Sequence, residues 1–216
     1  MDTVRLEVGE DGVASVTLDR PEALNIYNLA MRDDLIEAFS ALRDLPEVGA
    51  VVLAAAGRHF SAGADLSEFG TAGSIYEARR IRWRRDPWGP LLAIEAPLVA
   101  ALHGYALGAG FEMALMCDFR LAAPDTGVGL PETKLGMLPS AGGSQTLARI
   151  VGPAAAARLV MTAENVAAEA ALGAGLVHQV VPDVDAAAYD LARRLAAVDR
   201  RAMKEARRQI RDAGWW

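Results

Sequence analysis

The fold of this chain is decided by the stretch from Gly104 to Gln145, GYALGAGFEMALMCDFRLAAPDTGVGLPETKLGMLPSAGGSQ, which carries two glutamates among many glycines. Gly108-Ala109-Gly110 has almost no side-chain bulk where an apolar helix over Phe111–Met116 is predicted to begin. The start of a helix offers unpaired N–H groups and the positive end of the helix dipole, which favour an oxygen that gains negative charge. Because Ala109 and Glu112 are three residues apart, the first turn places a donor and a carboxylate on the same side.

Each glutamate also has an ordinary interpretation. Glu112 lies in a first helical turn, where an acid commonly does no more than complement the dipole. Glu132 follows Leu130-Pro131 and, taken alone, is an ordinary solvated loop acid. Because functional acids are a minority at such positions, neither residue by itself predicts a site.

A third segment, upstream of both glutamates, favours the functional interpretation. Val51–Ala55 is a short apolar, β-branched run bounded by Gly57, which predicts a buried strand. It leads into Ala62-Gly63-Ala64, where the Ala64 N–H is a second candidate donor. Two convergent backbone N–H groups, from Ala64 and Ala109, would make an oxyanion hole, which stabilises an enolate or a tetrahedral oxyanion. Two donors and two carboxylates together predict an acid/base site for one small substrate.

These residues resemble the crotonase superfamily, the enoyl-CoA hydratase/isomerase group. The resemblance spans about Val4 to Pro182 in the family's order. The matching segments are Arg20-Pro21-Glu22-Ala23-Leu24-Asn25, Phe60-Ser61-Ala62-Gly63-Ala64-Asp65-Leu66, GYALGAGFE from Gly104, Pro131-Glu132, LGMLPSAGGSQ from Leu135, Gly175-Leu176-Val177 and Val180-Val181-Pro182. The resemblance implies an α/β fold, the crotonase (ClpP-like) spiral of β-β-α units with twisted sheets surrounded by helices.

The resemblance also implies an activity, the addition of water across the 2,3 double bond of an enoyl-CoA thioester, or the reverse dehydration. The N–H groups of Ala64 and Ala109 would hold the enolate oxygen. Both glutamates would position the water, with Glu132 more closely tied to the α-carbon proton. Because such a pair would titrate together, fixed acid and base labels stay open. Double-bond isomerisation, or a non-catalytic subunit that binds acyl-CoA or a partner protein, is the alternative.

Coenzyme A would be part of the substrate, and no separate cofactor is expected. The residues that the resemblance implies for substrate and CoA binding are Ala23, Leu24, Arg58, Ala62, Asp65, Leu66 and Ser140. Ser140 stands where the family usually has glycine. One expectation is that its hydroxyl hydrogen-bonds the water or a glutamate; the alternative is that its Cβ narrows the pocket and changes the substrate. The Arg79–Arg85 cluster contacts CoA phosphates or forms a solvated helix face on a flap, and solvated faces are the commoner case.

Composition narrows the class of protein. A chain of 216 residues with 52% hydrophobic content can bury one substantial core. A net charge of −6 argues against a nucleic-acid partner. No apolar stretch approaches membrane-spanning length, and the start MDTVRLEVGED is unlike a signal peptide, so we expect a cytoplasmic protein with no membrane partner. The single cysteine, Cys117, is predicted to be a core thiol, and His59, His103 and His178 lack metal-ligand spacing.

The periodicity of apolar residues predicts the order of elements. Strands are predicted at Val4–Val8, Val13–Leu18, Val51–Ala55, Leu98–Leu102, Phe119–Ala122, Gly127–Leu130 and Leu176–Val181. Helices are predicted at Leu29–Leu45, Ile75–Trp88, Phe111–Met116, Ser144–Val151, Ala154–Met161, Asp185–Ala197 and Arg201–Asp212.

We expect a core domain over residues 1–182 and a shortened C-terminal helical segment over 183–216. Typical members of the family carry further C-terminal helices beyond the position of Trp216, which help to build a trimer and cover the CoA site. By resemblance we expect a homo-oligomer, a trimer or a hexamer. The terminal Ala213-Gly214-Trp215-Trp216 is predicted to be either an aromatic contact with a partner subunit or a frayed end.

Overall fold

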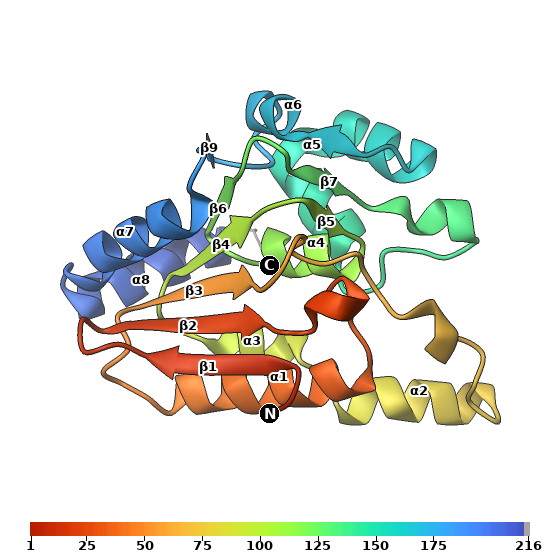
Figure 1. The fold of residues 1–216 in the computed structure, drawn as a ribbon, viewed down its shortest axis with the longest axis horizontal. Coiled ribbons are helices and arrows are strands. Elements are labelled where there is room, and N and C mark those ends of the chain that lie inside the picture. Colours follow the sequence, from red (N-terminus) through yellow and green to blue (C-terminus); the bar gives the residue numbers. More distant parts are fainter. Residues whose placement is uncertain (214–216) are drawn as a thin grey trace.

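The structure is a computed structural model that describes residues 1–213, apart from the side chains of Arg82 and Trp83. Within this part of the chain the main sheet has six strands in the order β1-β2-β3-β4-β6-β9 (Figure 1). Their bounds are β1 Val4–Val8, β2 Val13–Leu18, β3 Ala50–Ala55, β4 Leu98–Leu102, β6 Phe119–Ala122 and β9 Gln179–Val180. β1 and β2 form an antiparallel hairpin, and the other neighbours pair in parallel.

A smaller sheet stands beside the main one. It pairs β5 (Tyr105–Leu107) in parallel with β7 (Gly127–Gly129), and β7 antiparallel with β8 (Val166–Ala167). The α-helices are α1 Leu29–Arg43, α2 Ile75–Arg84, α3 Trp88–Ala93, α4 Ala109–Leu115, α5 Gly143–Thr162, α6 Ala168–Gly173, α7 Val184–Ala196 and α8 Arg200–Asp212. The 3-10 turns are η1 Pro21–Ala23, η2 Leu66–Glu68 and η3 Pro131–Leu135.

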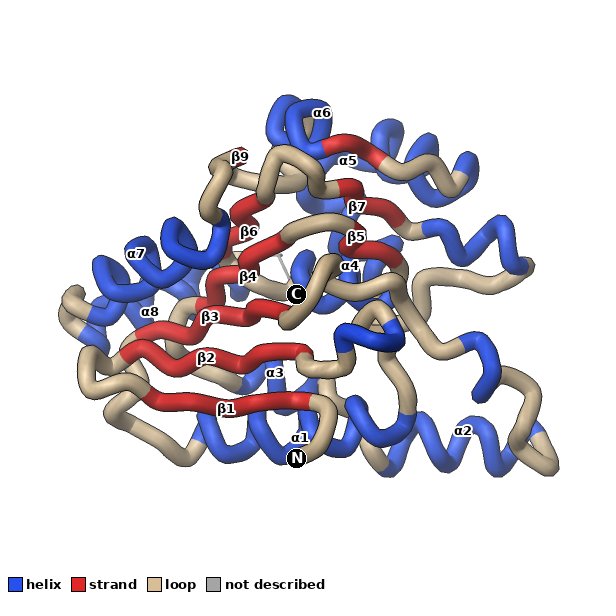
Figure 2. The backbone as a smooth tube through the Cα atoms, in the orientation of Figure 1, coloured by secondary structure: helices blue, strands red, loops and turns tan. Residues whose placement is uncertain are grey.

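Both faces of the main sheet are covered, which explains why its central strands are apolar throughout. In β3, Val51 and Leu53 join the core cluster that includes side chains of α1 and α3. The alternate residue Val52 joins a second cluster with Ala188 of α7. Figures 1 and 2 show α1 running alongside β1 and β2, and α7 packs mainly on the central strands β3 and β4. The α/β fold class is therefore the one that the sequence predicts.

One predicted helix is too long at its end. The sequence predicts a helix over Ile75–Trp88, but α2 ends at Arg84, and a separate helix, α3, begins at Trp88 after Arg85-Asp86-Pro87. A residue that precedes proline is disfavoured in the helical region, so Asp86 stops the first helix before Pro87. The residues before and after Asp86-Pro87 both have helical spacing, so the pattern alone does not reveal the break.

Other differences are at short elements. The predicted final strand Leu176–Val181 pairs with β6 only at Gln179 and Val180, while Leu176 and Val177 are buried in the core. The strands β5 and β8 and the helices α3 and α6 were not predicted, because two to six residues are too few to show a period. The predicted helices Ser144–Val151 and Ala154–Met161 are both present inside α5, which is kinked at Gly152 (φ 79°, ψ 161°).

The C-terminal helix α8 is fastened to the start of β4 by a largely buried ion pair. Nε of Arg207 donates to Oδ2 of Asp118 over 2.6 Å, and the same carboxylate oxygen accepts the N–H of Leu98 over 2.7 Å. Nη1 of Arg207 also donates to the Ile94 carbonyl. The structure describes α8 up to Asp212, and Gly214-Trp215-Trp216 lie outside the described residues.

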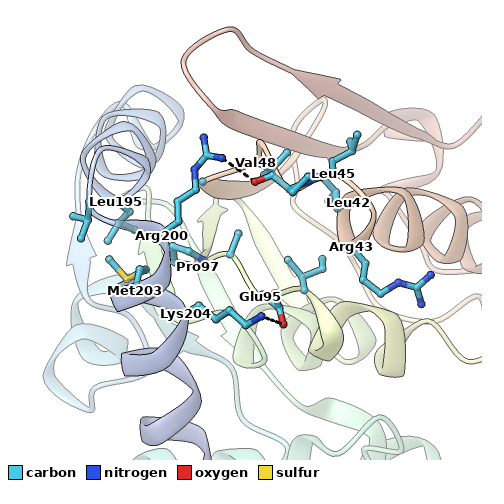
Figure 3. A pocket seen from close by; sticks show the side chains of 15 residues that line it. Leu42, Arg43, Leu45, Val48, Glu95, Pro97, Leu195, Arg200, Met203 and Lys204 are labelled. Carbon is cyan, nitrogen blue, oxygen red and sulfur yellow. Dashed lines mark hydrogen bonds and ion pairs between the residues drawn. The ribbon is translucent and has the colours of Figure 1, made fainter.

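A small cavity of about 150 Å³ lies along the same seam, between α8 and the ends of α1 and α3 (Figure 3). Its walls are mostly apolar, and two polar contacts cross its rim. Nη1 of Arg200 donates to the Pro46 carbonyl over 2.8 Å, and Lys204 pairs with Glu95 over 2.5 Å. These contacts pin α8 to the sheet end at which β3 and β4 begin.

The Arg207–Asp118 pair should be worth far more than an exposed pair on the same helix. Replacing Arg207 by Met leaves the Asp118 carboxylate partly uncompensated, and we expect a loss of about 3 kcal/mol in the free energy of unfolding. Arg208→Met removes only the exposed pairs with Glu205 and Asp212 and should cost under about 1 kcal/mol. Urea denaturation of both variants measures the difference, and equal losses would contradict this account of how α8 is held.

Candidate active site

Three turns meet at one edge of the molecule because short parallel pairings align them. Ser61 bridges to Ala106 of β5, and Leu107 of β5 pairs with Gly129 of β7. The Leu107 N–H donates to the Ser61 carbonyl over 2.9 Å, and the Gly108 N–H to the Gly129 carbonyl over 3.0 Å. The chain leaves these pairings into the Ala62–Ala64 loop, into α4 and into η3, and residues of all three segments line one cavity.

Glu112 is buried in the first turn of α4, with 3% of its surface exposed. Its Oε1 accepts the N–H groups of Ala141 and Gly143, each over 2.8 Å. Gly143 is the first residue of α5, so the unpaired N–H groups at that helix start hold the carboxylate. Because Glu112 is buried, it is not a surface acid that only complements the α4 dipole. The backbone donors instead stabilise negative charge on Glu112.

Close approach at this point requires a residue without a side chain. A Cβ on Gly143 would lie 2.7 Å from Cγ of Glu112, and one on Gly108 would lie 3.0 Å from Oε1 of Glu132. Gly108 also has a φ of +51°, in the region that favours glycine. Gly143 and Gly108 are therefore explained by backbone packed directly against the two glutamates.

Glu132 has a different environment from Glu112. It lies on η3 and is half-buried, and its Oε2 has no hydrogen-bond partner within the described residues. Burial raises the pKa of its carboxyl above the ordinary value of 4.5. The interpretation of Glu132 as a solvated loop acid is therefore wrong, and the carboxyl is suited to carrying a proton.

Glu112 and Glu132 both line one cavity of about 470 Å³. Its floor includes the loop Ala62–Ala64 together with Gly108 and Ala109. The remaining walls are Leu66, Phe69, Pro131, Leu135, Gly136, Met137, Leu138 and Ser140. The structure thus brings together the two acids and the two proposed donor residues, which the sequence places far apart.

The N–H groups of Ala64 and Ala109 are available to donate to a bound oxygen. Ala109 is the first residue of α4, so its N–H has no acceptor within the helix. Around Ala64, the N–H of Ala62 donates to Leu24, that of Gly63 to Oγ of Ser61, and that of Asp65 to Tyr27. No acceptor for the Ala64 N–H is found among residues 1–213. A Cβ on Gly63 would lie 3.8 Å from Cα of Gly108, so the two donor segments are neighbours.

The predicted substrate-binding residues divide into two groups. Ala62, Leu66 and Ser140 line the cavity, as expected of residues that contact the substrate. Ala23, Leu24, Asp65 and Arg58 do not. The Leu24 carbonyl instead accepts the Ala62 N–H over 3.0 Å. The Asp65 carboxylate accepts the N–H of Ser67 and lies 3.7 Å from Arg20, so it shapes the loop.

Sequence reasoning missed the residue that clamps this loop, Asn25. Its side chain is fully buried, with Nδ2 donating to the carbonyls of Ala56 and His59 and Oδ1 accepting the Arg20 N–H, all over 2.8 Å. Its backbone carbonyl accepts the hydroxyl of Ser61. The signal in the sequence is an asparagine closing a turn, at a φ of +51° that asparagine tolerates better than most residues.

The Arg79–Arg85 cluster lies on α2 and ends at Arg85, just after the helix. None of its described side chains lines the cavity, and Arg85 pairs with Asp33 over 2.7 Å. Trp83 has no described side chain. The histidines contact backbone: His103 meets the Gly57 carbonyl, His59 accepts from Tyr105 and His178 from Arg120. No cluster of three or more candidate metal ligands occurs within residues 1–213.

Cys117 is buried, and burial raises the pKa of its thiol to about 12, which fits the predicted core role. Among the described helices, none has both the length and the apolar character needed to cross a membrane.

The raised pKa of Glu132 predicts how stability depends on pH. Below its ordinary value of 4.5 the carboxyl is protonated in both folded and unfolded states, and Glu132→Gln should leave stability unchanged. As the pH rises through the raised pKa, the wild type bears a half-buried charge and loses stability relative to the variant. Melting temperatures of both proteins between about pH 4 and pH 8 test this. A difference that does not grow with pH would contradict it.

Comparison with known proteins agrees with this geometry. The profile of the enoyl-CoA hydratase/isomerase family matches residues 9–213. A protein of Mycobacterium tuberculosis named a probable enoyl-CoA hydratase is 41% identical over 175 residues, which cover 80% of this chain and 66% of that protein. The 2,3-dehydroadipyl-CoA hydratase of Escherichia coli is 37% identical over 206 residues, which cover 93% of this chain and 79% of the relative.

A solved structure agrees as well. The crystal structure of an enoyl-CoA hydratase from Mycobacterium smegmatis superposes with a TM-score of 0.87 and 34% identity, covering 94% of this chain and 80% of the other. The predicted crotonase architecture is confirmed by this similarity. The chain belongs to the enoyl-CoA hydratase/isomerase family.

Proposed function

We propose that this protein is an enoyl-CoA hydratase, which adds water across the 2,3 double bond of an enoyl-CoA thioester or catalyses the reverse dehydration. The observation that carries the proposal is the single cavity containing Glu112, Glu132 and the backbone of Ala64 and Ala109. Relatives named as enoyl-CoA hydratases support the reaction class. CoA would enter as part of the substrate, with no separate cofactor.

The chemistry divides between donors and acids. Water adding to C3 pushes charge onto the thioester oxygen, and the N–H groups of Ala64 and Ala109 would stabilise that enolate. Each such donor is typically worth about 3 kcal/mol in the transition state. The apolar walls of the cavity strengthen these interactions because they exclude water.

The different surroundings of the two acids support a division of labour. Glu112, whose Oε1 accepts two N–H groups, would act as the carboxylate that takes the proton from water. Glu132, whose pKa is raised by burial, would act as the acid that gives a proton to C2. Each addition leaves Glu112 protonated and Glu132 ionised, and proton exchange with solvent restores both.

An isomerase needs only one group that moves a proton between two carbons, and Glu132 alone would suffice for it. The additional carboxylate of Glu112, held in the same cavity by α5, favours hydration. A non-catalytic binding subunit would not need Glu132 placed with a buried, unpartnered oxygen, because such a group costs stability.

The family resemblance supports three finer parts of the proposal. We expect a homo-oligomer, a trimer or a hexamer, in the cytoplasm, which light scattering and fractionation would test. Arg58 is exposed outside the cavity, where a guanidinium could meet a CoA phosphate. If it does so, Arg58→Ala raises KM for the CoA thioester and leaves kcat unchanged.

The test of the reaction is hydration of crotonyl-CoA, followed as loss of the conjugated thioester absorbance. We expect Glu112→Gln and Glu132→Gln each to lower kcat by about 10³-fold, within the usual range for a general acid or base. Binding of a saturated acyl-CoA should be retained in both variants. Turnover that is unchanged in either variant would exclude the role proposed for that acid.

A glycine pair tests whether the placement of Glu112 matters. Gly143→Ala puts a Cβ 2.7 Å from Cγ of Glu112 and should lower kcat by about 10²-fold through misplacement of the carboxylate. Gly173→Ala is the matched control, because Gly173 is also helical and has nothing within 4 Å of an added Cβ. The control should keep full activity. Similar activities for the two variants would contradict the tight fit at Glu112.

A further inference from the structure

Thr133, the residue after Glu132, makes a hydrogen bond that joins η3 to another part of the fold. Its hydroxyl donates to the Val160 carbonyl over 2.7 Å, across 27 positions of sequence. The other hydrogen bonds of this turn are local: the N–H of Gly136 donates to Thr133, and that of Met137 to Glu132. Local bonds shape η3 but do not fix where it sits relative to the cavity.

Val160 is an available acceptor because of its place in α5. The helix ends at Thr162, and Ala163 follows in the left-handed conformation. The last carbonyl groups of a helix have no N–H partner four residues further along. The Thr133 hydroxyl donates to one of these carbonyl groups from outside the helix. The bond therefore completes the hydrogen bonding of both groups and holds η3 against the end of α5.

The opposite end of α5 holds the other acid. The N–H of Gly143, the first residue of α5, donates to Glu112. The helix also packs against both α4 and η3. One helix, kinked at Gly152, therefore contacts the carboxylate of Glu112 at its start and the turn that bears Glu132 near its end.

We infer that Thr133 is a positioning residue, whose hydroxyl fixes η3 on the end of α5 so that the Glu132 carboxyl faces Glu112 across the cavity. This inference rests on the proposed hydration and adds to it the means by which the separation of the two carboxyl groups is set. A displacement of even ~1 Å in a catalytic group can cost about 10²-fold in rate, so one anchoring bond is significant.

The test compares Thr133→Val with Thr133→Ser and Thr162→Val. The valine variant keeps the shape of threonine and removes the hydroxyl, whereas the serine variant keeps the hydroxyl. Thr162→Val is a matched control, because the Thr162 hydroxyl also donates to an α5 carbonyl, that of Arg158 over 2.7 Å, but this bond is exposed and stays within α5. Melting temperatures establish that each variant is folded.

We expect Thr133→Val to lower kcat for crotonyl-CoA by about tenfold or more, with KM changed less than about threefold. Thr133→Ser should restore most of the rate, and Thr162→Val should match the wild type. If Thr133→Val is as active as Thr162→Val, or if Thr133→Ser is as impaired as Thr133→Val, the inference is overturned.

A second readout does not depend on turnover. NMR titration with ¹³C-labelled glutamate reports the pKa of the Glu132 carboxyl, assigned with Glu132→Gln. We expect Thr133→Val, but not Thr162→Val, to return that pKa toward its ordinary value, because a displaced turn is better solvated. A wild type that fails to hydrate crotonyl-CoA would overturn the proposed function, whereas an unmoved pKa in Thr133→Val would overturn this inference alone.

Discussion

The structure of the site depends on one constraint, the parallel register that joins the Ser61 bridge, β5 and β7. Because Ser61 lies beside Ala106 and Leu107 lies beside Gly129, three chain segments leave the pairing together. One segment carries the Ala64 N–H, one begins α4 with Ala109 and Glu112, and one turns into η3 with Glu132. A one-residue slip of β5 against β7 would turn its side chains to the opposite face and separate the acids.

The two acids are chemically identical in the sequence, and the fold makes them different. Backbone donors at the start of α5 meet the carboxylate of Glu112, whereas Glu132 has a buried oxygen with no partner in the described part of the chain. The first environment favours negative charge and the second opposes it. A single helix contacts both environments, so the geometry and the division of protons have a common structural origin.

Sequence patterns predicted what is local and periodic. The strands Val4–Val8 and Val13–Leu18 and the bulk-free turn at Gly108 follow from alternation and glycine alone. The meeting of Glu112 with Ala141 and Gly143 could not be predicted, since it depends on how α5 packs against α4. Neither could the placement of Arg58 outside the cavity, nor the bond from Thr133 to Val160. These depend on distances between segments that no local pattern encodes.

The central claim is that Glu112 takes a proton from the water that adds to C3 while Glu132 gives a proton to C2, both from the same side of the substrate. Hydration of crotonyl-CoA in D₂O, with the product analysed by proton NMR, tests it most directly. Because Glu112 and Glu132 face one cavity, the account predicts a single deuterium at C2, on the same face as the new hydroxyl at C3. Deuterium on the opposite face, or distributed over both faces, would contradict it.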